Sequence, residues 1–462
     1  MRLEGKKEQS LVSWMIKRSA TPRRVYVPLA YGEGMEVEPC VVVGQHVQAG
    51  EVIAVPITER AVTIHASIAG EVMTIGFFAH PFLGEATAIE IRAEAHQKTL
   101  PAIGHERTGW KNFSREEMAG ILRCSGVVDL SSGMEPVHLS LMRDFDFKKY
   151  PLVLNACESE PYVTSAHALM MSHPVEILKG AEIMRTLAGA ERVVIAIEEN
   201  KLEAAELLKS KVYFLRWNNY EIKVLPIRYP QENPVCLRQK LFAQDPVDAV
   251  CNKNDFCPVF DVGTTVAVYE AVVMQKPLYE RVITVSGECV VEAKNIWAPL
   301  GMTIKDAFGA CRGLLREPKR VLVNGPMRGT AQPNLDTPVM PATQAVLALS
   351  RESVFDGESE SCIRCHRCVE VCPMGISPMM VTLAAENDLF EISRHWGLDH
   401  CIECGNCAYI CPAKRPMIDL IRYARLNDHQ EKLTVPEPTD VMADSLQQES
   451  HQEKREALAE PV

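Results

Sequence analysis

Several features that define common protein classes are missing from this sequence of 462 residues. No apolar run approaches the roughly 18 residues that a membrane-spanning helix needs. The first residues carry charges but have neither the apolar stretch nor the small-residue cleavage site of a secretory signal. Basic residues do not predominate, because 49 Lys and Arg face 60 Asp and Glu, giving a net charge of −11. Nucleic acid is therefore not expected as a partner, since binding its phosphates requires a basic surface.

The remaining composition is that of an ordinary globular protein, with 47% apolar and 24% charged residues. A disordered or fibrous chain is thereby excluded, and the length suggests about three domains. We expect a cytoplasmic protein that associates with a membrane through partners, peripherally on the cytoplasmic side of the inner membrane.

Cysteine is abundant, with 16 residues, although structural disulfides are rare in cytosolic proteins. Eight of the cysteines form two runs of one pattern, C-x₂-C-x₂-C-x₃-C-P. The first run is Cys362, Cys365, Cys368 and Cys372, followed by Pro373, and the second is Cys401, Cys404, Cys407 and Cys411, followed by Pro412. This pattern is typical of bacterial proteins that hold two [4Fe–4S] clusters.

The spacing also predicts which cysteines share a cluster. Three thiolates two residues apart can surround one cluster, while the fourth, displaced by the proline turn, points to the other. We therefore predict that Cys411 completes the first triplet and that Cys372 completes the second. Structural zinc is the alternative, but zinc usually takes two separated C-x₂-C pairs. Helix formers and apolar residues at helical spacing between the runs favour a helical two-cluster domain over a β-hairpin ferredoxin.

The other eight cysteines are scattered and are expected mostly to be small buried apolar residues. Two of them, Cys251 and Cys257, lie six residues apart and could in principle bind a metal. The full set is Cys40, Cys124, Cys157, Cys236, Cys251, Cys257, Cys289 and Cys311.

Residues 23–95 consist of short runs rich in Val and Ile that are interrupted by glycines, a pattern typical of an all-β module. The segment resembles the barrel-sandwich hybrid shared with lipoyl and biotinyl carriers. A carrier needs a modifiable lysine at the hairpin tip, whereas residues 58–60 are Thr, Glu and Arg. We therefore predict no carrier role, and we expect His65 to pack in the core.

Residues 112–275 alternate helical and strand patterns, which predicts a parallel α/β sheet. The helix that follows Ser114 begins with capping-box spacing to Glu117. Ligands of such sheets bind beyond the carboxyl ends of the strands. That rule points to the loop after the strand PLVLNA, residues 157–162, for which an ordinary acidic turn is the alternative. Residues 280–330 contain strand-like segments, a turn and a helix at NIWAPLGMTIKDAFGAC, and no P-loop. From about residue 428 the chain turns polar, as in a disordered tail or a loose helix.

Several motifs together resemble the C subunit of the Rnf electron-transport complex, with PduS-type microcompartment cobalamin reductases as relatives. The motifs are IHASIAGEV, NACESEPYVT, DVGTTVAVYEAV, RVITVSGECV, NGPMRGTAQPNLDTPV and the two cysteine runs. The resemblance implies a multidomain α+β fold with four parts. These are a barrel-sandwich hybrid (1–100), a Rossmann-like α/β flavin-type domain (112–275), a β-grasp, SLBB-like module (280–335) and a helical two-cluster ferredoxin domain (352–427), before a polar tail (428–462).

The resemblance also implies a function. It predicts electron transfer between NADH and ferredoxin, through two [4Fe–4S] clusters and FMN, in a membrane complex that moves Na⁺ or H⁺. The partners would be the other subunits of that complex and ferredoxin or another redox protein. The matching residues expected to line a flavin or nucleotide cleft are Asn155, Glu158, Glu160, Pro161 and Tyr162.

Three flavin-associated segments depart from the family pattern. The loop G-x-G-G-A-G-F-P-T corresponds to residues 120–136, which lack its double glycine and its Phe-Pro-Thr. The Gly-Gly-Glu that follows Tyr-Pro-Gln in the family corresponds here to Glu232, Asn233 and Pro234, and the Asn of Asn-Val-Gly-Thr is Asp261. A Cβ in the glycine loop would block the approach of a flavin to the backbone.

Three hypotheses follow for the function. In the first, the chain binds FMN and accepts hydride from NADH. In the second, it keeps the clusters without flavin, and the α/β domain is a scaffold. In the third, which is non-redox, the clusters only brace the fold. No residue stands out as a general acid or base, so any chemistry would belong to the cofactors. Because the flavin-associated residues are altered, NADH dehydrogenase activity of the chain itself is left open.

Overall fold

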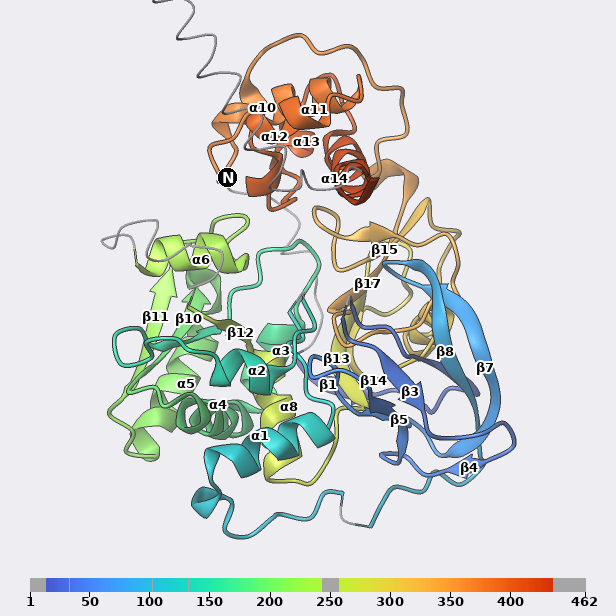
Figure 1. Ribbon diagram of the computed structural model, residues 1–462, viewed down its shortest axis with the longest axis vertical. Coiled ribbons are helices and arrows are strands. Elements are labelled where there is room, and N and C mark those ends of the chain that lie inside the picture. The colour runs from blue at the N-terminus through green and yellow to red at the C-terminus, as the bar shows by residue number, and fades with distance from the viewer. Residues whose placement is uncertain (1–13, 33, 102, 132, 243–256, 435–462) are drawn as a thin grey trace, which may run out of the picture. The chain divides into compact units, whose positions relative to one another are not determined.

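The structure is a computed structural model in which residues 14–434 are described, except residues 33, 102, 132 and 243–256. The chain divides into two compact units, one that ends at Asp356 and one that begins at Gly357. Figure 1 traces the elements of each unit. The units are described separately below.

The first domain of the larger unit is all-β, as the glycine-punctuated sequence predicts. One antiparallel sheet has the strand order β2-β8-β7-β4, and a smaller one has the order β3-β5-β6. The strands are β2 (Arg24–Pro28), β3 (Val37–Pro39), β4 (His46–Val47), β5 (Val52–Pro56), β6 (Ile64–His65), β7 (Gly70–His80) and β8 (Gly84–Ala93). His65 is buried and bonds through its ring nitrogens to the carbonyls of Gly50 and Cys124, so its predicted place in the core is confirmed.

The second domain contains a four-stranded sheet in the order β11-β10-β9-β12, and every pair of neighbouring strands is parallel. This confirms the parallel sheet that the alternating pattern predicts. The strands are β9 (Leu152–Asn155), β10 (Val193–Glu198), β11 (Tyr220–Leu225) and β12 (Val259–Asp261). Asn155, Glu198 and Asp261 are the last residues of their strands, so these polar residues lie at one edge of the sheet.

Helices pack around this sheet (Figure 1). They are α1 (Arg115–Cys124), α2 (Val137–Met142), α3 (Ser165–Ser172), α4 (Pro174–Ala188), α5 (Leu202–Phe214), α6 (Pro234–Leu241) and α8 (Val262–Val272), with short 3₁₀ turns at Trp110–Asn112 and Glu199–Lys201. The predicted capping box is present, because the Ser114 hydroxyl accepts from the Glu117 amide and the Glu117 carboxylate accepts from the Ser114 amide. Helices α4 and α8 cross closely at Gly180, where a Cβ would lie 1.9 Å from the Thr265 carbonyl oxygen.

The third part is a six-stranded sheet in the order β1-β14-β13-β17-β15-β16. Its elements are β13 (Glu280–Ser286), β14 (Lys294–Pro299), α9 (Ile304–Ala310), β15 (Arg320–Val323), β16 (Thr330–Ala331) and β17 (Ala345–Leu349), followed by a 3₁₀ turn at Arg351–Ser353. Two features differ from the expectation. The segment NIWAP, expected to be a turn, is strand β14, and the remote strand β1 (Ile16–Arg18) pairs with it in parallel.

The smaller unit is helical, which confirms the helical rather than β-hairpin character of the cysteine-rich region. It contains α10 (Arg367–Glu370), α11 (Pro378–Ala385), α12 (Phe390–His395), a 3₁₀ turn at Leu398–His400, α13 (Asn406–Ile410) and α14 (Met417–Thr434). The polar segment expected from residue 428 onward is therefore helical up to Thr434, and residues 435–462 lie outside the described part.

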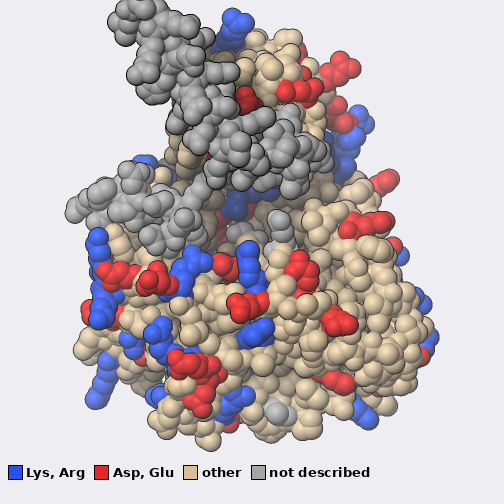
Figure 2. All heavy atoms as spheres, in the orientation of Figure 1, with Lys and Arg blue, Asp and Glu red and all other residues tan. Residues whose placement is uncertain are grey.

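Among the described residues, no helix is both long enough and apolar enough to cross a membrane. On the face shown in Figure 2, Lys and Arg side chains alternate with Asp and Glu over the described surface and form no continuous basic field.

The close approach of α4 and α8 gives a test of the packing. Ala at position 180 would place its Cβ against the backbone of α8, so we expect Gly180→Ala to lower the free energy of unfolding by about 1–3 kcal/mol or more. Gly120, on the exposed face of α1, has no atom within 4 Å of where a Cβ would lie, so Gly120→Ala should raise that free energy by roughly 0.5–1 kcal/mol. Urea unfolding followed by tryptophan fluorescence measures both, and equal effects of the two substitutions would contradict the packing.

Candidate functional site

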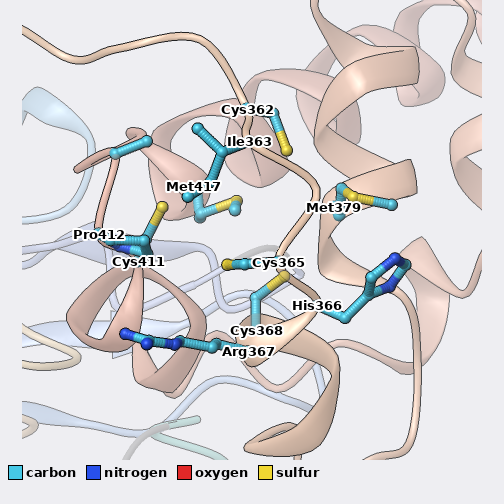
Figure 3. A pocket seen from close by; sticks show the side chains of 11 residues that line it. Cys362, Ile363, Cys365, His366, Arg367, Cys368, Met379, Cys411, Pro412 and Met417 are labelled. Carbon is cyan, nitrogen blue, oxygen red and sulfur yellow. The ribbon is translucent and has the colours of Figure 1, made fainter.

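The smaller unit contains a pocket around which four cysteines gather. Its sulfur-bearing residues include Cys362, Cys365, Cys368 and Cys411. Figure 3 shows the four side chains arranged around a common space, with Met379 and Met417 beside them. The pocket is open to solvent, and about 310 Å³ of space lies within it and in front of it.

A second pocket of similar size, about 300 Å³, is lined by Cys372, Cys401, Cys404 and Cys407. The fourth cysteine of each run therefore lies with the triplet of the other run, in the crossed arrangement that the spacing predicts. All eight cysteines of the two runs are accounted for by the two pockets, four in each.

Local backbone geometry produces this arrangement twice. Arg364 and Glu403, which occupy equivalent positions in the two runs, have left-handed φ angles of 55° and 50°. His366 and Gly405, two residues further on, also have positive φ, and each is the N-cap residue directly before a short helix, α10 or α13. Helices α10 and α13 contact one another. Because both runs fold alike and face one another, each can extend its last cysteine to the other pocket.

The donor set of each pocket suits an iron–sulfur cluster. Thiolates are soft ligands that favour iron–sulfur clusters, Zn or Cu(I) over Mg or Ca. Among the described residues, no group of three or more Cys, His, Asp and Glu side chains is gathered closely enough to hold a single metal ion. A zinc ion would need all four sulfurs within about 2.3 Å of one point. Four thiols in each pocket match the ligand number of one [4Fe–4S] cluster.

Burial affects the thiols themselves. It raises the pKa of Cys368, Cys401 and Cys407, so that these thiols stay protonated until a cation displaces their protons. Apolar side chains line both pockets, among them Met417 in the first and Ile418 in the second.

Sequence reasoning missed a group of charged residues beside the second pocket. The Glu403 carboxylate bonds Arg422 at 2.8 Å and also bonds Arg425. Arg425 in turn donates to the carbonyl oxygens of Leu398, at 3.1 Å, and Cys401. The Glu403 amide points at the Cys401 sulfur, 3.4 Å away. These contacts fix the loop that carries Cys401, and hydrogen bonds to cluster sulfurs are among the factors that set cluster potentials.

The larger unit contains the second candidate site, at the carboxyl edge of the parallel sheet. The five residues expected to line a cleft there are all buried: Asn155, Glu158, Glu160, Pro161 and Tyr162. The side chains of Asn155 and Tyr162 bond within the protein, Asn155 to the carbonyl of Glu232 at 2.7 Å and Tyr162 to the Glu288 carboxylate.

Glu158 caps helix α3 from the loop after β9. Its carboxylate accepts from the Ala166 amide at 2.8 Å and forms an ion pair with Lys201 at 3.5 Å. Lys201 also pairs with the fully buried Glu198 at 3.3 Å. The buried cation thus lies between two carboxylates that both belong to this edge of the sheet.

Glu160 links the α/β domain to the loop between β15 and β16. Its carboxylate accepts from the Tyr229 hydroxyl at 2.9 Å and from the amides of Met327 and Arg328 at 3.2 and 3.0 Å. Gly325, with φ 115°, leaves room for it, since a Cβ there would lie 2.4 Å from the carboxylate. Burial, followed by the charge of Glu232, raises the pKa of Glu160 to about 8.

Glu232 comes from the segment between β11 and α6 and reaches the same loop. Its Oε2 accepts from the Ser159 hydroxyl at 2.6 Å, from the Glu160 amide at 3.0 Å and from the Ser159 amide. Its other oxygen lies 3.5 Å from the Arg328 guanidinium.

Two further carboxylates meet at the start of α8. Asp261 caps this helix, and its Oδ1 accepts from the Thr264 amide at 2.7 Å and from the Thr264 hydroxyl at 2.5 Å. The same hydroxyl lies 3.3 Å from Asp129, whose carboxylate also accepts from the Ser131 amide and hydroxyl. Burial of the carboxyl group and the nearby charge of Asp261 raise the pKa of Asp129 to about 7.

Comparison with known proteins assigns families to all four parts of the chain. Residues 1–96 match the RnfC barrel sandwich hybrid domain, 122–270 the Nuo51 FMN-binding domain, 282–331 the SLBB domain and 356–412 the 4Fe-4S dicluster domain. The C subunit of the proton-translocating ferredoxin:NAD(+) oxidoreductase complex of Clostridium ljungdahlii is 34% identical over 411 residues, covering 89% of each chain. The chain belongs to the RnfC family of ion-translocating oxidoreductase complexes.

Two further relatives have the same designation. The C subunit of the ion-translocating oxidoreductase complex of Rhodobacter capsulatus is 30% identical and covers 90% of this chain and 80% of its own. The C subunit of the Na(+)-translocating ferredoxin:NAD(+) oxidoreductase complex of Acetobacterium woodii is 28% identical. Its match covers 87% of this chain and 90% of its own. The Rnf resemblance and the predicted multidomain α+β fold, with its barrel-sandwich, flavin-type, SLBB and ferredoxin parts, are confirmed.

In the flavin-type domain, described residues at the carboxyl edge of the sheet already bond one another where a flavin phosphate would be expected. Met134, in the stretch that corresponds to the family's glycine loop, has φ 49° and is buried. The amides of Ser159, Glu160 and Thr264 already donate to carboxylates of the chain itself. The residues at the edge of the sheet therefore do not fit a flavin phosphate.

The remaining cysteines follow the expectation in part. Cys157, Cys257, Cys289 and Cys311 are buried, whereas Cys40 and Cys124 are exposed and Cys236 is intermediate. The first member of the pair considered for metal binding, Cys251, lies outside the described residues.

The raised pKa values of Asp129 and Glu160 predict a pH dependence of stability. Both folded-state values lie above the unfolded ones, so the folded protein binds more protons and loses stability as the pH rises from about 4 to about 8. Asp129→Asn, beside Asp261 and the buried Arg281, removes one titrating group and should flatten this decline. Urea unfolding at pH 5 and pH 8 measures the fall in the free energy of unfolding between these two pH values. The variant Glu59→Gln, which changes an exposed carboxylate, serves as the control. A decline equally steep in wild type and Asp129→Asn would contradict the assignment.

Proposed function

We propose that this protein is the electron-transferring C subunit of an ion-translocating ferredoxin:NAD oxidoreductase complex, and that its eight motif cysteines bind two [4Fe–4S] clusters. One-electron transfer is the chemistry that such clusters supply when bound. The observation that carries the proposal is the crossed arrangement of the cysteines in two separate pockets, four thiols to each.

The residues of the smaller unit have defined tasks in this proposal. Cys362, Cys365, Cys368 and Cys411 hold one cluster, and Cys372, Cys401, Cys404 and Cys407 hold the other. Apolar side chains such as Met379 and Met417 limit the access of water to the first pocket. The ion pairs of Glu403 keep the second cysteine loop in place.

The family context supports partners and a location. The relatives are named as subunits of complexes that translocate protons or Na⁺ and act on ferredoxin and NAD⁺. We propose that this chain likewise associates with the other subunits of such a complex and exchanges electrons with ferredoxin or another redox protein. Its place would be peripheral, on the cytoplasmic side of the inner membrane.

Paired substitutions test both the clusters and the crossed ligand sets. The wild-type chain, purified without oxygen, should contain about eight iron and eight sulfide ions. Cys365→Ser with Cys411→Ser affects one proposed cluster only, so about four iron ions should remain. Cys365→Ser with Cys372→Ser affects both clusters, and the iron content should fall well below that level.

The matched control is Cys40→Ser with Cys124→Ser, which removes two exposed thiols outside the pockets and should leave iron content unchanged. The reverse order of the two motif variants would indicate that each run binds its own cluster. A wild-type chain that takes up zinc and no iron under the same conditions would overturn the proposed function.

A further inference from the structure

The carboxyl edge of the parallel sheet offers three sets of backbone N–H groups, each of a kind that binds anionic ligands. Carboxylates of the chain itself occupy all three. Glu158 accepts from the first turn of α3, Asp261 from the first turn of α8, and Glu232 from the loop after β9. The donors are thus satisfied without any ligand.

Three acids at this edge lie in the three segments that depart from the family pattern: Asp129, Glu232 and Asp261. They converge on one place although they come from distant parts of the sequence. Asp129 and Asp261 share the Thr264 hydroxyl. Asn155 connects them to Glu232, because it lies in register beside Asp261 and its side chain donates to the Glu232 carbonyl at 2.7 Å. The register of β9 and β12 therefore places the three departures close together at one sheet edge, where they form an acidic network.

This network opposes the binding of an anion. An FMN phosphate would have to displace a carboxylate from its N–H partners and then remain close to the others, and like charges repel strongly where water is scarce. Two cations offset part of this charge: the buried Arg281 lies near Asp129 and Asp261, and Arg328 lies 3.5 Å from Glu232. The Arg281 guanidinium, however, donates to the carbonyl oxygens of Leu130, at 3.1 Å, and Pro341.

The space next to the backbone is also restricted in the stretch that corresponds to the family's glycine loop. The family's glycine loop lets a flavin ring approach the backbone because glycine has no side chain. In this chain the buried side chain of Met134 and the carboxylate of Asp129 stand in the corresponding stretch. The stretch therefore lacks the bare backbone that the double glycine of the family pattern provides.

From these contacts we propose that the α/β domain binds no flavin, and that the protein takes up electrons singly from a one-electron carrier protein instead of as hydride from NADH. Hydride brings two electrons together, and flavin is the group that accepts them as a pair and releases them singly. Without flavin, the electron acceptors of the chain are the two [4Fe–4S] clusters, and each cluster takes one electron at a time. This step rests on the function proposed above. Oxidation of NADH then belongs to another component.

The first experiment uses the full chain with its clusters. It is mixed with excess FMN without oxygen, desalted, and assayed for flavin by fluorescence after denaturation. We expect only background flavin, and we expect cluster absorbance to bleach with dithionite but not with NADH, even when FMN is present. One FMN per chain, or bleaching by NADH alone, would overturn the inference.

Restoring the family residues at two positions tests whether the acids at the sheet edge are the reason that FMN does not bind. Glu232→Gly with Asp261→Asn frees the amides of Ser159 and Glu160 and removes two charges, so FMN should bind at least about tenfold more tightly than to wild type. The control Glu36→Gln with Glu59→Gln removes two exposed charges in the β domain and should leave FMN binding unchanged. An unchanged affinity of the first variant, or an equal gain in the control, would show that the network does not exclude flavin.

Folding of the variants is checked by circular dichroism and by iron content. If the double variant fails to fold, Glu232→Gln serves instead, because it removes the charge while its amide oxygen still accepts from Ser159 and Glu160. A measurable gain in FMN affinity is then expected, and no gain contradicts the inference. A chain without iron refutes the proposed function but not the absence of flavin, whereas a chain with both iron and FMN refutes only the inference.

Discussion

The exchange of one cysteine between two similar loops is the constraint on which the smaller unit depends. Cys411 lies with the triplet of the first run, and Cys372 lies with the triplet of the second. Neither pocket is complete until both loops are folded and α10 packs against α13. The helices between the runs, α11 and α12, contact one another and α14, so they hold the two loops at a fixed separation. Each pocket therefore requires both loops to be in place.

Features encoded by local spacing could be predicted from the sequence. The cysteine runs predict the crossed pockets because the repeated left-handed residues, such as Arg364 and Glu403, set the direction of each loop locally. Alternating strand and helix patterns predict the parallel sheet, since β9 and β10 are nearly continuous apolar runs. The capping box of α1 depends on two residues three positions apart and could be predicted for the same reason.

Features that depend on distant residues could not be predicted in this way. Strand β1 has only three residues, mostly exposed, and it becomes a strand through pairing with β14, far away in the sequence. The sequence of β14 resembles a turn because Pro299 and Gly301 stand close together at its end and mask its short apolar run. The ion pairs of Glu403 with Arg422 and Arg425 bridge the second cysteine loop and α14, and no spacing rule connects such positions.

The two candidate sites differ in how they tolerate the loss of a ligand. Backbone N–H groups at the edge of the sheet need acceptors whether or not a ligand is bound, because an unpaired buried donor is costly. Glu232 and Asp261 provide such acceptors, and the raised pKa values of Glu160 and Asp129 are the consequence of burying acids so close together. The donors at this edge are thus satisfied by the chain itself. In the cysteine pockets, by contrast, the four thiols of each set would be joined by the inorganic core of a cluster. The carboxylates at the sheet edge are therefore part of the packing of the α/β domain, whereas the two sets of four thiols are arranged for the clusters proposed above.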